Sequence, residues 1–340
     1  MKPTDFAFYL SKYLGGYIAG QQNFSPNTIV SYRDTFKLFL VFCKEQKNIK
    51  VEKLSIGQFS KHLVGDFLEW LKTERGCSDS TMQQRLTVIR NFFSFLQEEA
   101  PEHLALCQEI MGMKFKKKPV APLMNYLTYD GIRGILAQPN QEKRQGRRDL
   151  VMLTLLYDSG ARVQELADIR VRDLRLGIPE GVNLFGKGSK WRHVPLMRPT
   201  VDLLKAYLEE QKLTGADCAD YPLFTNHSGY KLNRAGIAYT VRKYANEARM
   251  ANPTHIPDIV TPHVFRHSKA MHLLQSGIDL IYIRDILGHA DVKTTEIYAR
   301  IDSDTKRQAL ESVYPASAPT TLRPSWIEND VVMKMLRDLE

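Results

Sequence analysis

The stretch His263-Val264-Phe265-Arg266-His267-Ser268 decides how the second half of this chain folds. Residues three or four apart on a helix share a face, so a helix here presents His263 and Arg266 together, with His267 close by. Two imidazoles and a guanidinium make an anion site, because the planar fork of an arginine matches two phosphate oxygens. The stretch therefore predicts a helix over residues 263–276 that binds an anion at its start.

A tyrosine follows, after another helix end and another histidine. Gly288 ends a helix predicted over residues 279–287, His289 lies directly after it, and Tyr298 falls in a short helix predicted over 291–300. A tyrosine hydroxyl is a poor nucleophile at neutral pH, because its pKa is near 10. It can attack a phosphodiester when positive groups stabilise the extra charge of the transition state. Alone, Tyr298 would be one packing tyrosine among 15.

Two upstream segments add further positive charge. The segment Ser159-Gly160-Ala161-Arg162-Val163-Gln164-Glu165 lies at a helix start and supplies Arg162 as a second guanidinium. The segment Gly186-Lys187-Gly188-Ser189-Lys190-Trp191-Arg192 predicts a hairpin between two strands. Arg162 could therefore add a second guanidinium to the expected anion site.

Two other kinds of site are excluded. His263 and His267 have a spacing seen in zinc sites, but Arg266 lies between them, and a cation beside a metal is unfavourable. Lys187 nearly fits a phosphate-binding loop, yet Gly188 stands where Ser or Thr should hold magnesium, and a strand pattern follows in place of a helix. We therefore expect neither a metal nor a nucleotide cofactor.

In order and spacing, these segments resemble the tyrosine recombinase family, also called phage-type integrases. The pattern of that family is an arginine, a hairpin lysine, His-x-x-Arg, a second histidine and a nucleophilic tyrosine. The resemblance extends to about residue 302, with a layout closest to simple recombinases of the Xer or transposon type. The matching positions here are Arg162, Lys187, His263, Arg266, His289 and Tyr298, and Glu165 fits an acidic residue often found after the first arginine.

The resemblance implies a mechanism. Tyr298 would attack a scissile phosphate and leave a 3′-phosphotyrosine and a free 5′-hydroxyl. Arg162 and Arg266 would clamp the non-bridging oxygens, and His289 would donate a further hydrogen bond to them. The remaining roles would be proton transfer near Tyr298 by His263, protonation of the departing oxygen by Lys187, orientation of neighbouring groups by Glu165, and a supporting role for His267. Neither a metal nor ATP would be needed.

The expected fold is mainly α with a small β-sheet, in two domains. Residues 1–111 predict a helical core-binding domain that clamps DNA, and residues 112–125 a basic linker. Residues 126–315 predict a mixed catalytic domain with strands at 169–176, 182–186 and 192–196. Residues 316–340 predict a flexible tail that ends in an amphipathic helix around Trp326–Leu336, which docks on its own protein or on a neighbour.

Composition supports a polyanionic partner. The net charge is +9, an excess that favours nucleic acid through counterion release. No apolar run approaches the ~20 residues that span a bilayer, and no secretory signal is evident, so a soluble cytoplasmic protein is expected. The four cysteines, Cys43, Cys77, Cys107 and Cys218, are far apart and predict free thiols in or near the cores.

Contacts to double-stranded DNA are expected from three places: the polar face of the helix that begins after residue 80, the linker, and the hairpin. For the helix face and for the linker, an ordinary solvated surface is the alternative. The candidate residues are Gln83, Gln84, Arg85, Arg90, Lys114, Lys116, Lys117, Lys118, Lys190 and Arg192. The resemblance also implies a homo-oligomer, a tetramer on two DNA sites that exchanges strands through a Holliday junction.

Two alternative functions remain open from the sequence: DNA relaxation of the type IB topoisomerase kind, and a catalytically silent DNA-binding regulator. The sequence does not name the target site. It also does not separate integration, transposition, dimer resolution and cassette exchange.

Overall fold

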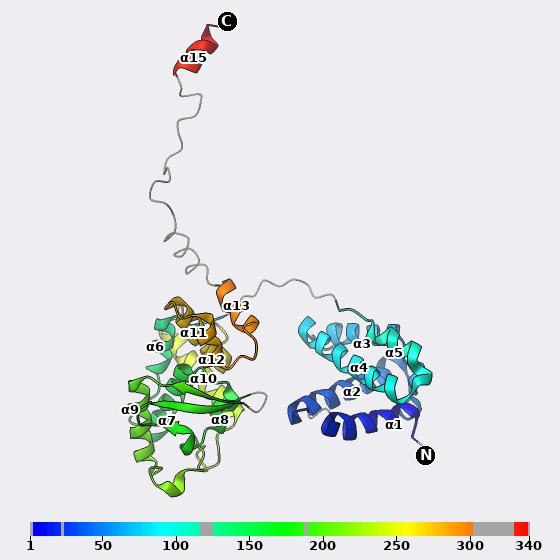
Figure 1. Ribbon diagram of the computed structural model, residues 1–340, viewed down its shortest axis with the longest axis horizontal. Coiled ribbons are helices and arrows are strands. Elements are labelled where there is room, and N and C mark those ends of the chain that lie inside the picture. The colour runs from blue at the N-terminus through cyan, green and yellow to red at the C-terminus, as the bar shows by residue number, and fades with distance from the viewer. Residues whose placement is uncertain (1–2, 22–23, 116–124, 187–189, 302–329, 339–340) are drawn as a thin grey trace. The chain divides into compact units, whose positions relative to one another are not determined.

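A computed structural model describes residues 3–21, 24–115, 125–186, 190–301 and 330–338 of the chain. It divides the chain into two compact units, Met1–Ala121 and Pro122–Glu340 (Figure 1). Helices predominate in both units, and a three-stranded sheet lies in the second, which confirms the predicted fold class. Among the described residues, no helix combines the length and the apolar content needed to cross a membrane.

The first unit is helical throughout its described part. Ser25 begins its longest described helix: the hydroxyl accepts a hydrogen bond from the amide of Thr28, and Pro26 takes the first helical position. The regular elements are α1 (Asp5–Lys12), a π-helical segment (Tyr13–Gln21), α2 (Pro26–Lys47), α3 (Lys61–Thr73), α4 (Asp79–Glu99) and α5 (Leu104–Met111).

Aromatic rings fill the core of the first unit. Phe39 stacks on Phe59 with ring centroids 5.0 Å apart and meets Phe67 edge to face at 5.2 Å. Phe92 of α4 meets Phe36 of α2 edge to face at 5.3 Å. Offset and edge-to-face pairs of this kind add about 0.5–1.5 kcal/mol each to the stabilisation from buried area.

The second unit places its sheet among helices. The three helices predicted over residues 263–276, 279–287 and 291–300 are present, with ends within two residues of the prediction. The regular elements are α6 (Tyr129–Leu136), α7 (Arg144–Ser159), α8 (Val163–Asp168), β1 (Leu174–Arg175), β2 (Gly181–Gly186), β3 (Lys190–Pro195), α9 (Arg198–Glu210), α10 (Arg234–Ala251), α11 (Pro262–Gln275), α12 (Leu280–Leu287), α13 (Lys293–Ile301) and α15 (Asp330–Arg337).

One predicted strand is largely wrong. The expected strand over residues 169–176 shortens to β1, because residues Val171–Asp173 form a 3₁₀ turn. The carboxylate of Asp173 accepts a hydrogen bond from the backbone amide of Arg170 at 2.8 Å and closes that turn. Side-chain hydrogen bonds of this kind give the backbone an alternative to a sheet ladder.

The sheet is antiparallel, in the order β1-β2-β3. Val182 of β2 pairs with Val194 of β3, and both side chains are buried in a core that includes α7. Helix α7 ends at Gly160, whose positive φ of 57° is the left-handed conformation that glycine adopts readily. This sharp end delivers Arg162 to the start of α8.

The four cysteines are free, as predicted. Cys43 and Cys107 are buried, and Cys77 and Cys218 are partly exposed. The predicted tail helix is present as α15, with exposed Val331 and Met335 four residues apart.

Candidate active site

Helix α11 positions the central arginine of the site. Pro262 takes its first helical position, so the first turn carries His263, and the next carries Arg266 and His267. Arg266 is only 2% exposed. Its guanidinium donates to the carbonyl oxygens of Gly160 at 2.7 Å and Leu287 at 2.5 Å. Helix α11 therefore ties the end of α7 to the end of α12.

Arg266 remains a cation at neutral pH. Burial and, next, the charge of Arg162 lower the pKa of Arg266 to about 9. A buried charge is stabilised only when hydrogen bonds surround it, and the two carbonyl groups supply them. The site therefore holds a fixed positive charge away from bulk water, where it acts strongly on a bound anion.

Arg162 supplies the second guanidinium. It donates to Glu165 Oε1 at 2.7 Å and to the carbonyl oxygen of Gly288 at 3.0 Å. The backbone amide of Arg162 donates to Glu165 Oε2 at 2.8 Å. These bonds bring Arg162 to the same helix end that Arg266 reaches.

Glu165 is held as a carboxylate. Burial would raise the pKa of Glu165, but hydrogen bonds and charge from Arg192 and Arg162 outweigh it and lower that pKa to about 2. The sequence predicted that Glu165 orients neighbouring groups, and in the structure Glu165 accepts a hydrogen bond from Arg162.

Tyr298 lies against His267. The distance from the Tyr298 hydroxyl to Nδ1 of His267 is 2.9 Å. Tyr298 is 2% exposed, and burial raises its pKa, although the charges of Arg266 and Arg162 oppose the rise. Burial, then the charges of His263 and Arg266, lower the pKa of His267 to about 4. At neutral pH, His267 is thus uncharged and able to accept a proton.

His263 does not take the place that the sequence assigned to it. It is exposed, and its ring centroid lies 5.0 Å from that of His267, as expected for residues four apart on a helix. Although the residue is exposed overall, partial desolvation of its ring and, next, the charge of Arg266 lower the pKa of His263. The histidine that meets Tyr298 is His267, so the predicted pairing of His263 with Tyr298 is not what the structure shows.

His289 follows the helix end as predicted. Gly288 closes α12 with a φ of 64°, and His289 Nδ1 then lies 2.8 Å from the hydroxyl of Thr295. The ring of His289 is nearly parallel to that of Tyr298, with centroids 6.4 Å apart. Burial, then the charges of Arg266 and Arg162, lower the pKa of His289 to about 4.

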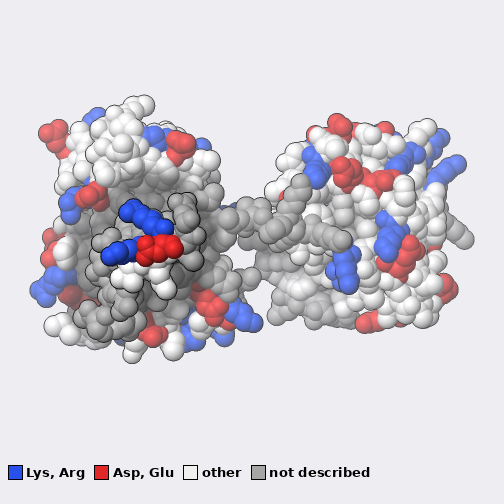
Figure 2. Space-filling model, turned by 90° about the horizontal axis from the view of Figure 1, so that it is seen from above, with Lys and Arg blue, Asp and Glu red and all other residues white. Residues whose placement is uncertain are grey.

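The predicted DNA contacts are only partly located. Lys187 and the linker residues Lys116, Lys117 and Lys118 lie outside the described residues. Lys114 and Lys190 are described and exposed. Figure 2 shows lysine and arginine side chains interspersed with aspartate and glutamate on the visible face of both units.

The polar face of α4 is partly engaged in the fold. Arg85 donates to the carbonyl oxygen of Ser31 at 2.9 Å and to the hydroxyl of Thr35 at 2.8 Å. Gln84 donates to the Ser31 hydroxyl at 3.0 Å. Both side chains hold α4 to α2, and Arg85 is partly buried there. Gln83, Gln84 and Arg90 are exposed, and their contacts with DNA stay predictions.

Arg192 also differs from its prediction. Its side chain is 11% exposed and makes two hydrogen bonds to Glu165, at 2.7 and 2.9 Å. Its Nε donates to the carbonyl oxygen of Ile286 at 2.9 Å. The guanidinium faces the interior, which does not fit the predicted contact with DNA. Its place in the predicted hairpin segment did not indicate that Glu165 and Ile286 would be its partners.

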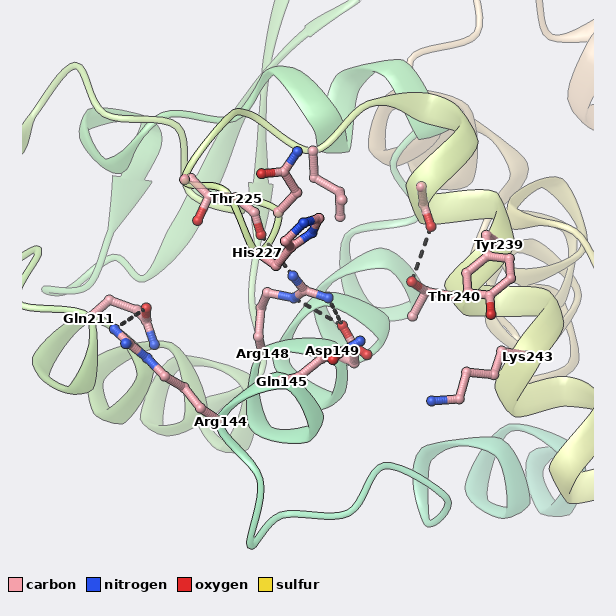
Figure 3. Close-up of a pocket in the computed structure, with 14 residues that line it drawn as sticks. Arg144, Gln145, Arg148, Asp149, Gln211, Thr225, His227, Tyr239, Thr240 and Lys243 are labelled. Atoms are coloured by element: carbon pink, nitrogen blue, oxygen red, sulfur yellow. Dashed lines mark hydrogen bonds and ion pairs between the residues drawn. The ribbon is translucent and has the colours of Figure 1, made fainter.

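A cavity of about 590 Å³ lies elsewhere in this unit. Arg144, Arg148 and Lys243 line it, and Arg148 is turned toward Asp149 (Figure 3). The residues of α7 that line it end at Asp149, whereas Gly160 follows the last residue of that helix, so about 15 Å of α7 separates the cavity from Arg162. The cavity is not part of the cluster around Tyr298.

Two protein families match the sequence of this chain. The phage integrase family matches residues 125–304, and the phage integrase N-terminal SAM-like domain matches residues 12–100. The first match covers α6 to α13 and hence every residue of the cluster around Tyr298.

Relatives span almost the whole chain. It is 32% identical over 301 residues to the putative integrase/recombinase y4rC of Sinorhizobium fredii, a match that covers 88% of this chain and 89% of that one. It is 30% identical over 320 residues to the tyrosine recombinase XerC of Thermodesulfovibrio yellowstonii, with 92% and 98% covered.

Solved structures show the same fold. XerH site-specific recombinase bound to palindromic difH substrate has a TM-score of 0.66 at 21% identity, covering 85% of this chain and 81% of that one. The Tn1549 transposon integrase in complex with transposon right end DNA has a TM-score of 0.68 at 16% identity, covering 89% and 99%.

Proposed function

The chain belongs to the phage integrase family and is a tyrosine site-specific recombinase; from this premise we propose that Tyr298 cuts and rejoins DNA strands through a 3′-phosphotyrosine link. The observation that carries the proposal is the contact between the Tyr298 hydroxyl and His267, at 2.9 Å. Arg266 and Arg162 are near enough for their charges to act on the pKa of Tyr298. A nucleophile, a proton acceptor and two cations therefore meet in one place.

The cleavage step follows from these groups. The Tyr298 oxygen forms a bond to phosphorus as the bond from phosphorus to the 5′-oxygen breaks, and His267 accepts the Tyr298 proton. Arg162 and Arg266 stabilise the charge on the non-bridging oxygens. The leaving 5′-oxygen takes a proton from Lys187, as the family resemblance implies.

The other two histidines contribute hydrogen bonds. Thr295 fixes the ring of His289 through Nδ1 and leaves Nε2 of His289 to donate to a phosphate oxygen. His263 is exposed at the start of α11, so its ring is available to contact the scissile phosphate. Religation reverses these steps with a new 5′-hydroxyl, so one phosphodiester replaces another and no ATP is consumed.

The substrate is duplex DNA with a specific recombination site, encountered in the cytoplasm. Phosphate contacts by exposed cations such as Lys114, Lys190 and Arg90 supply affinity, and contacts to base edges select the site. We further propose that four protomers act on two sites through a Holliday junction. Such exchange would serve integration, excision or transposition of a mobile element, and α15 would dock on its own unit or on a neighbour.

Covalent trapping tests the proposal. Duplexes that bind the protein are selected from a random-sequence pool and nicked beside the scissile phosphate, so that the short 5′-hydroxyl strand diffuses away after cleavage. Without metal or ATP, the wild type should form a DNA adduct that survives denaturation, and Tyr298→Phe should not. Tyr282→Phe, an exposed tyrosine on α12, is the matched control and should behave as wild type. Specific binding without an adduct would contradict the proposal.

A further inference from the structure

Three arginines meet at one helix end. Arg192 donates to the carbonyl oxygen of Ile286 at 2.9 Å, Arg266 to Leu287 at 2.5 Å, and Arg162 to Gly288 at 3.0 Å. The last carbonyl groups of a helix lack partners within the helix and carry the negative end of its dipole, so they attract cations. Arg162 and Arg266 belong to the proposed mechanism, whereas Arg192 has no role in it.

Arg192 and Arg162 share the carboxylate of Glu165. Glu165 Oε1 accepts from Arg162 at 2.7 Å and from Arg192 at 2.9 Å, and Oε2 accepts from the Arg162 amide at 2.8 Å and from Arg192 at 2.7 Å. A carboxylate has about four acceptor positions, so all of them are taken. Arg162 is therefore fixed through a carboxylate that Arg192 holds from the other side.

Two glycines keep room for this cluster. A Cβ atom on Gly288 would lie 2.8 Å from Cδ of Arg192, and one on Gly186 would lie 2.9 Å from Glu165 Oε1. Gly186 ends β2 and pairs with Lys190 at the start of β3, so the cluster packs against the base of the hairpin that carries Lys187.

We infer that Arg192 is a positioning residue for strand cleavage: it holds Glu165, and through Glu165 it places Arg162 and the base of the Lys187 hairpin. The inference rests on the proposed function. Within the described part of the chain, the hydrogen bonds of Arg192 go to Glu165 and Ile286, and neither is a group that we expect to meet the scissile phosphate. Its effect should therefore appear in the cleavage step and not in DNA binding.

The test separates cleavage from binding. Arg192→Gln and Arg192→Lys are compared with wild type in single-turnover adduct formation at saturating DNA, and their DNA affinity is measured by titration. Neither glutamine nor lysine can form the paired hydrogen bonds that Arg192 makes to Glu165. Both variants should therefore slow cleavage about 100-fold, as expected when a catalytic group is displaced. DNA affinity should change less than about threefold, since no phosphate contact is lost. Arg175→Gln, exposed on β1 of the same sheet, is the charge-matched control.

A double-mutant cycle shows whether Arg192 acts through Glu165. If it does, Arg192→Gln combined with Glu165→Gln should cleave no more slowly than the slower single variant. Losses that multiply would overturn the inference, as would weaker DNA binding with wild-type cleavage at saturation. Thermal unfolding of each variant separates misfolding from mispositioning, and Arg192→Lys retains the charge if Arg192→Gln fails to fold. A wild type without an adduct would overturn the proposed function itself, whereas an active wild type with an unaffected Arg192→Gln would overturn only this inference.

Discussion

The hydroxyl of Tyr298 lies 2.9 Å from Nδ1 of His267, so the proposed nucleophile meets the histidine that directly follows Arg266 in the chain. The contact joins α13 to α11. Because burial and nearby charge keep His267 neutral, its free ring nitrogen is available as a proton acceptor at the start of the reaction.

Replacing His267 should slow strand cleavage. His267→Asn keeps an acceptor atom near the position of Nδ1 but cannot accept a proton, so single-turnover adduct formation should fall about 10²- to 10⁴-fold. His193→Asn, which changes an exposed histidine on β3, should have little effect. A rate for His267→Asn equal to wild type would show that another group takes the Tyr298 proton.

The loss of cleavage activity at low pH should begin at a more acidic pH than it would with an ordinary histidine as the base. An ordinary histidine is half protonated near pH 6.5, whereas the pKa of His267 is lowered to about 4. His267 therefore stays neutral, and active as a base, as the pH falls from 7.5 to 5.5. The second-order rate constant for adduct formation should be nearly constant over that range, with DNA binding followed in parallel. A half-loss of the rate near pH 6.5 would contradict the neutral state assigned to His267.

Thr295 should matter through the ring of His289. Thr295→Val keeps the shape of a buried side chain but removes the hydroxyl that lies 2.8 Å from His289 Nδ1. The ring is then no longer fixed, and cleavage should slow about tenfold, as for the loss of a hydrogen bond that orients a group at a reaction centre. Thr294→Val, at the exposed neighbouring position, should cleave as wild type. Equal effects of the two substitutions would deny the positioning role of Thr295.

Gly288 should be more sensitive than another glycine of the same backbone conformation. Gly288→Ala and Gly277→Ala both place a side chain at positive φ, which costs about 1 kcal/mol of stability. Only at Gly288 does the new methyl group approach Arg192, because nothing lies within 4 Å of a Cβ on Gly277. Gly288→Ala should therefore lower the unfolding temperature further and should also slow cleavage. The two variants are compared by thermal unfolding and adduct formation, and the same loss in both would exclude a specific contact with Arg192.

Local rules were enough to predict most of the helices. Ser25 and Pro26 start α2, and Gly288 ends α12, because capping depends only on neighbouring residues. The prediction of a strand over residues 169–176 was wrong for a reason that is also local. The carboxylate of Asp173 accepts a hydrogen bond from the amide of Arg170 and closes a turn, and the spacing of apolar residues gives no indication of such a bond.

The residues of the site were recognisable from their order, but their partners were not. His263 and His267 share a helix face, and only the docking of α13 decides which of them meets Tyr298. Arg85 and Arg192 looked like free cations, yet each donates to groups distant in the chain, Ser31 and Glu165. Such long-range pairs follow from tertiary packing, which a single sequence does not disclose.

The most direct test of the account is the chemical identity of the trapped link. The adduct of wild-type protein with the nicked duplex is digested with protease, and the DNA-bound peptide is identified by mass spectrometry, while exonucleases establish which DNA end is blocked. The account predicts a phosphodiester between the Tyr298 oxygen and the 3′-phosphate of the cut strand. Attachment through another residue, or to a 5′-end, would contradict it.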